Sequence, residues 1–567
     1  MKKEVAQEIN SVLSKKNIKL NLKEIENLIE IPKNPELGDY AFPCFVLSKQ
    51  LRKSPDLIAK DLEKKINKTK VFSEVKSVAG YLNFFVNKND FAQKVIYNVL
   101  KQKKRYGYSK SHKKKSIMIE FSQPNTHKAF HVGHIRGTSI GESLSRIHEF
   151  FGDKVIRANY SGDTGMHIAK WIWCYNKYHK NEKLKNSEQW IASIYVDAVK
   201  RLKENKEYQE EVNEINRLID KKLNNSINNL WKKTRKLSID SWKEIYKELN
   251  THFDVHYFES NLESKAKKLS NKLVKNKIAK IDNGAVIVDL KKYGLDIWVV
   301  LRSDGTVLYS AKDLALAYKK LEDFPKINSS IVLIAHEQDF YFKQLEKVLE
   351  LMKFKKADNY NHLFFGMVRL PSGKMSSRTG ENILYSDFIK EVKDFSKKRI
   401  IQKSGKINKK ELEKRAEILS IASIKYSMLK QSPNKNIVFK KEDALNFEGN
   451  TGPYILYTYA RANSILRKAK LKTSEKINIK DIEKIENELL KKIQNFSEVV
   501  QNAYKNLNPS LIANYSYELA QLFNEFYHSC PVIGSENEEF RISLIKCFKQ
   551  VLENSLNLLG IETLEEM

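Results

Sequence analysis

The fold of this 567-residue chain is decided by residues 116–152, SIMIEFSQPNTHKAFHVGHIRGTSIGESLSRIHEFFG. The stretch opens with the short apolar run SIMIEF, which predicts a buried strand, and a polar turn follows. Apolar residues then recur at helical spacing up to Gly152, and glycine commonly ends a helix. These residues therefore predict a strand, a turn and a helix, in that order.

The same order of elements follows immediately. Residues 154–160, KVIRANY, predict a second strand, residues 161–165 a turn, and residues 166–180, MHIAKWIWCYNKYHK, a second helix. Strands that alternate with helices at this spacing indicate a Rossmann-like, doubly wound parallel sheet, which binds ligands beyond the carboxyl ends of its strands. Sheet character returns at residues 283–290, 297–310 and 329–339.

The chain is too long for one hydrophobic core, so a multidomain α/β protein is expected. The lysine-rich residues 101–116 predict a linker after an N-terminal unit of helices and short strands. From about residue 405 the pattern is helical with few glycines, which is typical of a bundle. The expected domains are a small α+β N-terminal domain at 1–110, a Rossmann-type catalytic domain at 111–404 with a mostly helical insertion at about 181–280, and an all-α C-terminal bundle at 405–567.

The formal net charge is +32, from 101 lysines and arginines against 69 aspartates and glutamates. Such a surplus favours polyanions, and nucleic acid leads because the sequence has no lipidation motif. The lysines are nevertheless spread along the chain, and lysine-rich usage can reflect genome composition. Charge alone therefore leaves two interpretations open: RNA binding, and a basic surface without a nucleic-acid partner.

The sequence lacks the patterns of a membrane span, a signal peptide and a cysteine-based metal or disulfide site. No run of about 18 apolar residues appears, and residues 1–20 lack the unbroken apolar block of a signal peptide. No membrane span and a cytoplasmic location are therefore expected. The four cysteines are far apart and form no C-x-x-C pair, so neither a disulfide framework nor a zinc ribbon is predicted, and no metal-binding residue is assigned.

Two short patterns carry the chemistry, and the first is HVGH at residues 131–134. Two histidines three positions apart near a helix start point to one side of the helix. Gly133 between them would let a flat base or ribose approach the backbone, and helix N-terminal N–H groups favour phosphate. An isolated copy of such a pattern would be weak evidence, but here it follows a predicted strand and turn.

The second pattern is a polar, glycine-flanked loop at residues 372–380, SGKMSSRTG. Lys374 would bring positive charge to the phosphates of a nucleotide, and Ser376 would bring a hydroxyl donor; such groups act by positioning and charge stabilisation. Most lysines of this chain are expected to be solvated surface charges, which is the alternative for Lys374. The convergence of His131, His134 and Lys374 on one crevice predicts an ATP-using ligase that charges RNA.

Together the two patterns resemble the His-Ile-Gly-His and Lys-Met-Ser-Lys-Ser signatures of class I aminoacyl-tRNA synthetases, with Val132, Ser377 and Arg378 as departures. Their surroundings resemble the arginyl-tRNA synthetase family nearly from end to end. The stretches that carry this likeness are residues 122–147, 159–165, 229–260, 301–317, 374–383, 447–466 and 554–567. The resemblance implies activation of L-arginine with ATP and Mg²⁺ to arginyl-adenylate, followed by transfer of the arginyl group to the 2′-hydroxyl of the terminal adenosine of tRNA(Arg).

Carboxylates are the best partners for a guanidinium, because they form bidentate, charge-assisted hydrogen bonds with it. Asp313 lies one helical turn after Tyr309, so both side chains could face one crevice. Taken singly, an aspartate at such a position is more often a helix N-cap or a surface residue, and the tyrosine could be a core residue. By resemblance, Tyr309, Asp313 and Gln338 contact the arginine side chain, and Glu120 and Asn125 contact its backbone amine and carboxylate. By the same resemblance the catalytic residues are His131, His134 and Lys374, and the ATP-binding residues are Pro124, Asn125, Lys128, His131, Gly133, His134, Met367, Val368, Lys374 and Ser376.

Residues 449–470 interleave tyrosines with arginines, which suits single-stranded bases that stack on such side chains. The alternative is an aromatic stripe packed in the core of a bundle. By resemblance this domain reads the anticodon loop, with RNA-binding residues Tyr454, Tyr457, Tyr459 and Arg461, and the N-terminal domain touches the corner of the tRNA. The resemblance also implies a monomer that needs bound tRNA for arginine activation. Two other functions stay open: a catalytically inactive paralogue that only binds RNA, and a synthetase for another amino acid.

Overall fold

The computed structural model describes the chain apart from residues 16–17, 19, 33, 67–70, 109–113, 356–358, 370, 372–383, 406 and 470–476. The chain divides into two compact units. One comprises Met1–Lys103, Ala469–Gln494 and Glu525–Cys547, and the other comprises Lys104–Lys468, Asn495–Asn524 and Phe548–Met567. Among the described helices, none combines the length and the apolar character that crossing a membrane requires.

The first unit contains a three-stranded antiparallel sheet in the order β1-β3-β2. Its N-terminal elements are α1 (Lys2–Ser14), α2 (Leu22–Leu28), β1 (Tyr40–Pro43), α3 (Ser48–Leu51), α4 (Pro55–Glu63), β2 (Phe72–Val78), β3 (Tyr81–Val86) and α5 (Lys88–Gln102). The start of α4 is set by Ser54, whose side chain accepts a hydrogen bond from the Leu57 N–H, and by Pro55 at the first helical position. The small α+β N-terminal domain expected from the sequence is confirmed.

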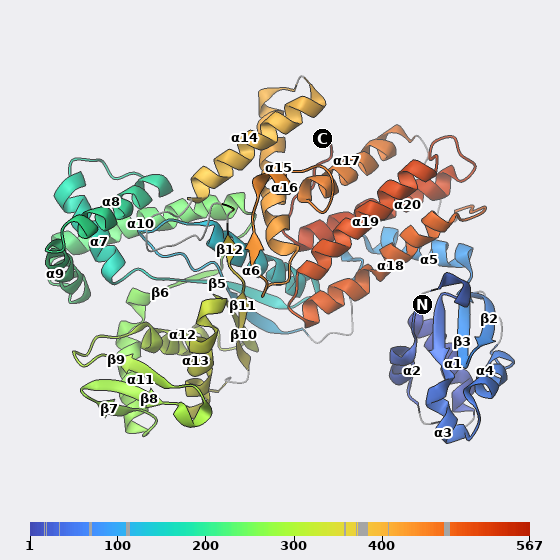
Figure 1. Ribbon diagram of the computed structural model, residues 1–567, viewed down its shortest axis with the longest axis horizontal. Coiled ribbons are helices and arrows are strands. Elements are labelled where there is room, and N and C mark those ends of the chain that lie inside the picture. Colours follow the sequence, from blue (N-terminus) through green and yellow to red (C-terminus); the bar gives the residue numbers. More distant parts are fainter. Residues whose placement is uncertain are drawn as a thin grey trace. The chain divides into compact units, whose positions relative to one another are not determined.

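The second unit is built on a five-stranded parallel sheet in the order β11-β10-β4-β5-β6 (Figure 1). The strands are β4 (Ser116–Glu120), β5 (Lys154–Ser161), β6 (Val255–Phe258), β10 (Ser329–Ala335) and β11 (Tyr360–Phe365). The chain enters at the central β4, adds two strands on one side and then two on the other, which is the predicted doubly wound topology. Ligands bind such sheets where the strand order reverses, and that point lies between the carboxyl ends of β4 and β10.

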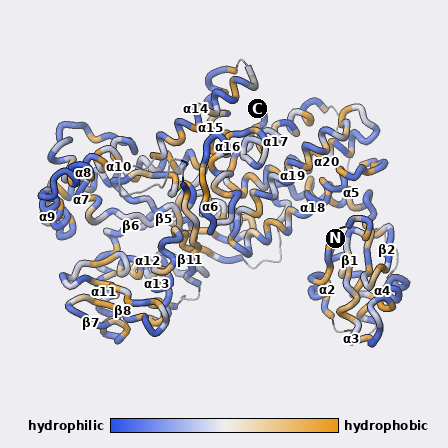
Figure 2. Tube along the Cα trace, in the orientation of Figure 1, coloured by the Kyte–Doolittle hydropathy of each residue, from blue (hydrophilic) through white to orange (hydrophobic). Residues whose placement is uncertain are grey.

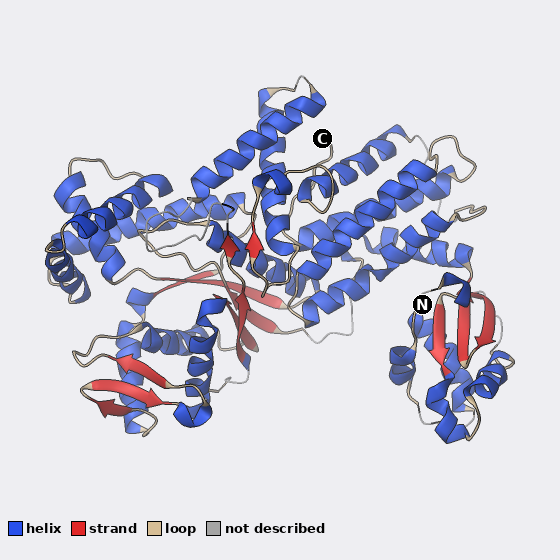
Figure 3. Cartoon of the chain, in the orientation of Figure 1, coloured by secondary structure: helices blue, strands red, loops and turns tan. Residues whose placement is uncertain are grey.

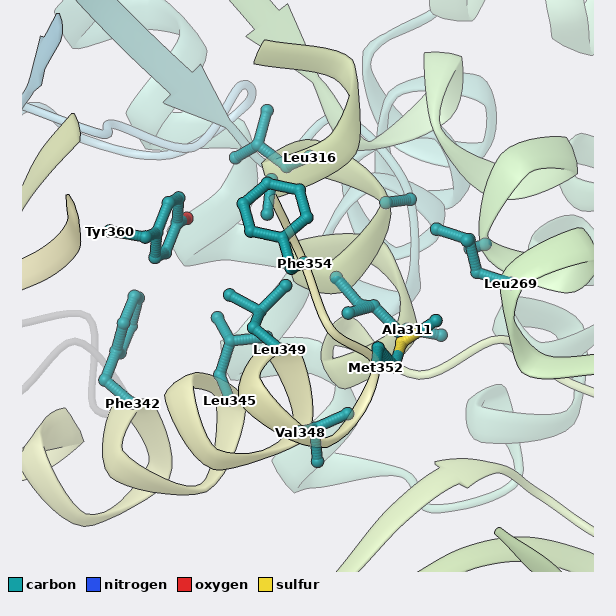
Figure 4. Close-up of a cluster of buried hydrophobic side chains, with 14 of the residues drawn as sticks. Leu269, Ala311, Leu316, Phe342, Leu345, Val348, Leu349, Met352, Phe354 and Tyr360 are labelled. Carbon is teal, nitrogen blue, oxygen red and sulfur yellow. The ribbon is translucent and has the colours of Figure 1, made fainter. Parts of the chain in front are cut away.

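The side chains of β4 alternate between two layers of helices. One layer contains α11 (Glu263–Lys275), α12 (Tyr309–Asp323) and α13 (Asp339–Leu351). Met118 packs in the core of this layer, and Glu120 pairs with Lys320 of α12. Figure 4 shows the part of that core between α12, α13 and the start of β11. Phe121 points the other way and packs on α6 (Val132–Phe150) at Gly141.

Gly141 is required where α6 crosses Phe121, because a Cβ at this position would overlap the Phe121 ring. We expect Gly141→Ala to lower the free energy of unfolding by about 1–3 kcal/mol, the usual cost of overpacking a core. Gly137→Ala is the matched control. Its added Cβ would lie 3.0 Å from the tip of the Phe365 ring, and the higher helix propensity of alanine opposes that crowding, so the free energy of unfolding should change less than in Gly141→Ala. Chemical denaturation measures both variants, and a Gly141→Ala protein as stable as the parent would contradict the packing argument.

A helical insertion with a core of its own lies between β5 and β6. It consists of α7 (Met166–Cys174), a π-helical turn (Tyr175–His179), α8 (Glu188–Glu204), α9 (Tyr208–Asp220) and α10 (Asn225–Glu248). The predicted helical segment at about 181–280 also contains β6, the edge strand of the parallel sheet. The strands β7 (Lys280–Asp282), β8 (Ala285–Asp289) and β9 (Ile297–Leu301) form a separate antiparallel sheet, so of the later segments with sheet character only 329–339 supplies a strand to the parallel sheet.

From α14 onward the described chain is helical, apart from the two-residue β13 (Ile437–Val438), which pairs in parallel with β12 (Val368–Arg369) (Figure 3). The helices are α14 (Tyr385–Ser404), α15 (Lys409–Leu429), α16 (Lys441–Ala444), α17 (Gly452–Lys468), α18 (Lys484–Lys505), α19 (Ser510–Ser529) and α20 (Glu538–Leu558). Figure 2 shows hydrophilic and hydrophobic residues alternating along them, as expected of helices with one buried face. The predicted all-helical C-terminal region is confirmed.

Candidate active site

The connection from β4 to α6 is held in an unusual backbone conformation. Ser122, Gln123 and His127 have φ angles of 77°, 53° and 61°, in the left-handed region that costs a non-glycine residue about 1–3 kcal/mol. Side chains from neighbouring elements fix this loop: Tyr246 contacts the Ser122 hydroxyl at 3.0 Å, and Thr234 contacts Nε2 of His127 at 2.7 Å. Backbone strain of this kind is typical of functional sites, and here it lies at the carboxyl end of β4.

The two histidines of HVGH lie together at the start of α6, as their spacing predicts. Their ring centroids are 3.9 Å apart. His131 is the N-cap and its Nδ1 accepts the Gly133 N–H at 3.2 Å, while Nδ1 of His134 accepts the His131 N–H at 3.1 Å. Because Nδ1 accepts in both rings, a neutral imidazole must carry its proton on Nε2, which leaves two Nε2–H donors at the helix N-terminus.

Both rings are neutral near pH 7. Burial, reinforced by the charge of Lys128, lowers the pKa of His131 to about 4. Burial together with His131 and Lys128 holds the pKa of His134 well below its ordinary value. The pair therefore acts as hydrogen-bond donors rather than as cations, and the positive field beside it comes from Lys128 and the helix dipole.

The predicted nucleotide-binding residues before α6 pack against the turn that follows β5. Asn125 approaches Gly162 so closely that a Cβ there would collide with its Oδ1 atom, and the Thr126 N–H donates to the Gly162 carbonyl at 3.0 Å. Pro124 is buried beside them, and Lys128 is half-buried with its ammonium 5.6 Å from the ring of Tyr195. Burial, and then the charge of Lys170, lowers the pKa of Lys128.

The predicted nucleotide-binding pair Met367 and Val368 is tied to α6 through Arg136. The buried Arg136 guanidinium donates to the carbonyls of Ser432, Pro433 and Lys435 at 3.3, 2.9 and 2.6 Å. The loop thus held presents Asn436, which accepts the Met367 N–H at 2.8 Å, and Ile437, whose N–H donates to the Met367 carbonyl at 2.9 Å. The backbone of residues 367–368 is therefore fixed beside the first turns of α6.

The predicted residues Lys374 and Ser376 lie outside the described residues. The chain re-enters the described part at Leu384, which forms an antiparallel bridge with His131, and the Tyr385 N–H donates to the Phe130 carbonyl at 2.9 Å. The carboxylate of Glu188 reinforces this junction, because it accepts the N–H groups of Phe130 and Ser386 at 3.0 and 3.1 Å. Burial raises the pKa of Glu188 to about 7.

The predicted pair Tyr309 and Asp313 meets at a third residue, Tyr341. The Tyr341 hydroxyl donates to Oδ2 of Asp313 at 2.6 Å, and the rings of Tyr309 and Tyr341 lie 4.9 Å apart. Burial and the nearby Glu259 and Glu120 carboxylates raise the pKa of Asp313 to about 7, against the Tyr341 hydrogen bond that lowers it. In the described part of the chain Asp313 has no ion-pair partner. When ionised, its carboxylate can therefore pair with a cationic ligand.

Two carboxylates near Asp313, Glu120 and Glu259, each form an ion pair with a lysine. Glu120 pairs with the buried Lys320 at 2.6 Å and accepts from Nε2 of Gln123 at 2.8 Å. Glu259 pairs with Lys312 at 2.9 Å. A carboxylate has lone pairs for further donors, so the pairing leaves Glu120 able to accept from an amine as well. Gln338 is exposed just beyond β10, at the same edge of the sheet.

Several residues that complete this site were missed in the sequence. Tyr341 was assigned no role from the sequence. Lys320 and Arg136 gave no signal, because nothing in the sequence separates them from the other basic residues of the chain. The Tyr160 hydroxyl is a further case: it is buried without a hydrogen-bond partner among the described residues. Burial, followed by the charges of Asp313 and Glu259, raises the pKa of Tyr160 well above its ordinary value.

The predicted RNA-binding residues lie on α17, and they differ in how much of each side chain is exposed. Tyr459 is 1% exposed, so its ring belongs to the core, and the predicted base-stacking role is corrected for this residue. Tyr454, Tyr457 and Arg461 are partly exposed. The Arg461 guanidinium lies 4.8 Å from the Tyr457 ring and donates to Asn524 at 2.6 Å, and Asn524 in turn donates to the Tyr454 hydroxyl at 2.9 Å.

Three family models match the chain. Residues 95–441 match the catalytic domain of tRNA synthetases class I (R), residues 455–567 match the DALR anticodon binding domain, and residues 1–86 match the arginyl tRNA synthetase N terminal domain.

Similar proteins cover the chain from end to end. An arginine–tRNA ligase of Clostridium kluyveri is 37% identical over 579 aligned residues, which cover 100% of both chains. An arginine–tRNA ligase of Clostridium perfringens is 37% identical and covers 98% of each chain. Among solved structures, the arginyl-tRNA synthetase of Thermus thermophilus superposes with a TM-score of 0.81 at 24% identity, with 100% of both chains covered.

Proposed function

The chain belongs to the arginyl-tRNA synthetase family, and we propose that the site at the carboxyl edge of its parallel sheet joins arginine to tRNA(Arg). It is an enzyme, a class I arginine–tRNA ligase that uses ATP. Residue roles are proposed from the geometry of the site.

The observation that carries the substrate assignment is the carboxylate of Asp313. The neighbouring Glu120 and Glu259 each have a lysine partner, whereas Asp313 accepts from the Tyr341 hydroxyl and has no ion-pair partner among the described residues. A guanidinium supplies the missing charge and can donate two parallel hydrogen bonds to one carboxylate. Lysine cannot form that two-pronged contact, so discrimination by binding alone is expected to suffice. We assign the side-chain contacts to Tyr309, Asp313 and Gln338, and the backbone contacts to Glu120 and Asn125.

In the first step, the carboxylate of arginine attacks the α-phosphate of ATP and pyrophosphate leaves. We assign His131 and His134 to the phosphates, because their Nε2–H groups and the N-terminus of α6 donate toward anions without reorganisation. We assign the backbone of Met367 and Val368 to the adenine base. The remaining residues assigned to ATP are Pro124, Asn125, Lys128, Gly133, Lys374 and Ser376. In the second step the 2′-hydroxyl of the terminal adenosine attacks the arginyl carbonyl, and AMP leaves.

Several broader properties are proposed with it. Mg²⁺ prefers oxygen ligands, so the imidazoles of the phosphate site do not suit it; we propose that it enters on the phosphates of ATP and assign it no residue. We propose a cytoplasmic monomer with domains at 1–110, 111–404 and 405–567. An inactive RNA-binding paralogue would be favoured by a degraded HVGH or a missing pocket carboxylate, and both are intact in this sequence.

The direct test is arginine-dependent exchange of pyrophosphate into ATP, with and without tRNA(Arg). We expect exchange with arginine and not with the other amino acids, and we expect it to require the tRNA. Charging of total RNA with each of the twenty amino acids provides the second measurement. Exchange with a neutral amino acid in place of arginine would overturn the assignment of Asp313.

The helical face formed by Tyr454, Tyr457 and Arg461 is proposed to contact single-stranded RNA. We expect Tyr457→Ala to weaken tRNA(Arg) binding about 5- to 10-fold, equivalent to about 1 kcal/mol, the lower end for loss of one base-stacking aromatic. Tyr459→Phe is the matched control, because this ring is buried and should leave RNA affinity unchanged. Filter binding at fixed ionic strength measures both, and equal affinities would remove Tyr457 from the interface.

A further inference from the structure

A cluster of metal-ligating side chains lies in the helical insertion, and none of its members is assigned to the reaction. The ligand atoms of Cys174, His179 and Asp197 all lie within 4.8 Å of one another, and this is the one such cluster that the described residues form. Cys174 ends α7, His179 ends the π-helical turn, and Asp197 comes from the adjacent α8. No part of the proposed ligase mechanism uses them.

The π-helical turn is what brings the cysteine and the histidine together. Residues five positions apart on a regular α-helix lie about 140° apart around its axis, so Cys174 and His179 would face different directions. A π-helical turn widens the helix and places positions i and i+5 close to one another, and such turns recur at functional sites. Asp197 then meets both side chains: its Oδ2 lies 3.4 Å from the Cys174 sulfur and 2.9 Å from Nε2 of His179.

We propose that Cys174, His179 and Asp197 bind one divalent transition-metal ion, with Zn²⁺ as the ion of choice. Sulfur, imidazole nitrogen and carboxylate oxygen are the zinc ligands of proteins. Zinc–ligand bonds of about 2.0–2.3 Å put neighbouring ligands of a tetrahedron about 3.3–3.6 Å apart. The 3.4 Å between the Cys174 sulfur and Oδ2 of Asp197 lies in that range, and the 2.9 Å hydrogen bond between Oδ2 and Nε2 of His179 would widen on binding. On binding, the metal replaces the thiol proton of Cys174 and the Nε2 proton of His179, and both protons pass to solvent.

The surroundings of the three ligands fit this assignment. Nδ1 of His179 contacts the Glu182 carboxylate at 2.6 Å, the carboxylate–histidine arrangement that orients metal-binding imidazoles. Arg201 donates to Oδ2 of Asp197 at 2.8 Å, so the guanidinium holds in place the same oxygen that faces Cys174 and His179. A dication together with the thiolate, the two carboxylates and this guanidinium gives a neutral cluster. Cys174 is fully buried, whereas the side chains of His179 and Asp197 are 22% and 25% exposed and leave an entry path.

The test is titration of the chelator-treated full-length protein with Co²⁺, which reports a thiolate ligand by its sulfur-to-cobalt charge-transfer absorption. We expect one equivalent of Co²⁺ to produce the band and Zn²⁺ to abolish it. Cys174→Ala should lose the band, His179→Gln should bind at least tenfold more weakly, and Glu182→Gln, which removes only the orienting carboxylate, should bind about 10- to 100-fold more weakly.

Matched controls separate the proposed site from nonspecific binding. Cys530→Ala removes another buried cysteine, and His362→Gln removes a histidine that also lies between two carboxylates, Asp339 and Glu346, but without a cysteine. Both should keep the band, and circular dichroism should show every variant folded. No band in the parent protein, a band retained in Cys174→Ala, or equal loss in Cys530→Ala would each overturn the proposal.

Discussion

Replacing His134 with alanine should lower kcat for arginine-dependent pyrophosphate exchange about 10²–10³-fold, the usual effect of removing one preorganised donor to a developing anion. The reason is the tautomer: Nδ1 of His134 accepts the His131 N–H, so the Nε2–H is the group available to phosphate. Because this hydrogen bond strengthens as charge develops on the leaving pyrophosphate, the loss should fall mainly on kcat and less on the KM for ATP.

The control for His134→Ala is His148→Gln, a substitution in the last turn of the same helix. His148 is buried and its Nδ1 contacts Asp153 at 2.9 Å, so the variant tests whether disturbing α6 is enough to lower activity. Thermal unfolding of both variants should be measured beside the exchange assay. A His134→Ala protein whose kcat stays within about threefold of the parent would remove the imidazole from the mechanism.

Much of the fold could be read from the sequence, because local chemistry and global topology agree in the first half of the sheet. The apolar run at 116–121 matches β4, and Gly152 follows the last turn of α6 with a φ angle of 83°, the left-handed conformation that favours glycine. KVIRANY matches β5. Each of these features is local: a short apolar run, a helical period, and a residue suited to one backbone conformation.

The later strands show where that reasoning stops. Residues 283–290 and 297–310 have the apolar content of buried strands, yet β8 and β9 pair antiparallel in a sheet of their own. Strand partners are chosen by contacts distant in sequence, which a single chain's pattern does not record. The same limit applies to the pairing of Glu120 with Lys320, since 200 positions separate the two residues and the lysine is one of 101 basic residues.

The metal cluster shows a different limit. Cysteine spacing predicts zinc only when ligands follow a familiar pattern such as C-x-x-C, and Cys174 with His179 does not. Their convergence depends on a π-helical turn in a segment whose sequence predicts an ordinary helix. A similar irregularity, three left-handed residues after β4, shapes the loop before α6 that is proposed to bind phosphate. Sequence reasoning therefore misses departures from regular backbone geometry. In both cases such a departure brings together the residues of a proposed site.

Asp313→Asn should weaken arginine binding about 10²–10³-fold, because truncating one partner of a buried, hydrogen-bonded charge pair costs about 2–5 kcal/mol. The amide keeps the shape of the side chain but removes the charge that the guanidinium neutralises. Asp323→Asn is the matched control on the same helix, since Asp323 pairs with Lys319 on the protein surface. Calorimetric titration of arginine into the tRNA-bound enzyme measures both Kd values, and a change of less than about threefold for Asp313→Asn would contradict the assignment.

The same carboxylate predicts how arginine affinity depends on pH. The pKa of Asp313 is raised to about 7, by burial and by Glu259 and Glu120, while the Tyr341 hydroxyl and Lys320 oppose the rise. The guanidinium stays charged throughout, so binding requires the ionised carboxylate. The Kd for arginine should therefore be constant above about pH 7 and should rise about tenfold for each pH unit below it. His131 and His134 stay neutral across this range and do not contribute.

Two variants decide whether Asp313 is the titrating group. Tyr341→Phe removes the hydrogen bond that holds the carboxylate ionised, so the midpoint of the pH profile should move to higher pH. Asp313→Asn should flatten the profile, since it removes the carboxylate that the guanidinium needs and whose pKa lies near 7. A profile that keeps its midpoint in both variants would assign the titration to another group, and the guanidinium would then need a different partner.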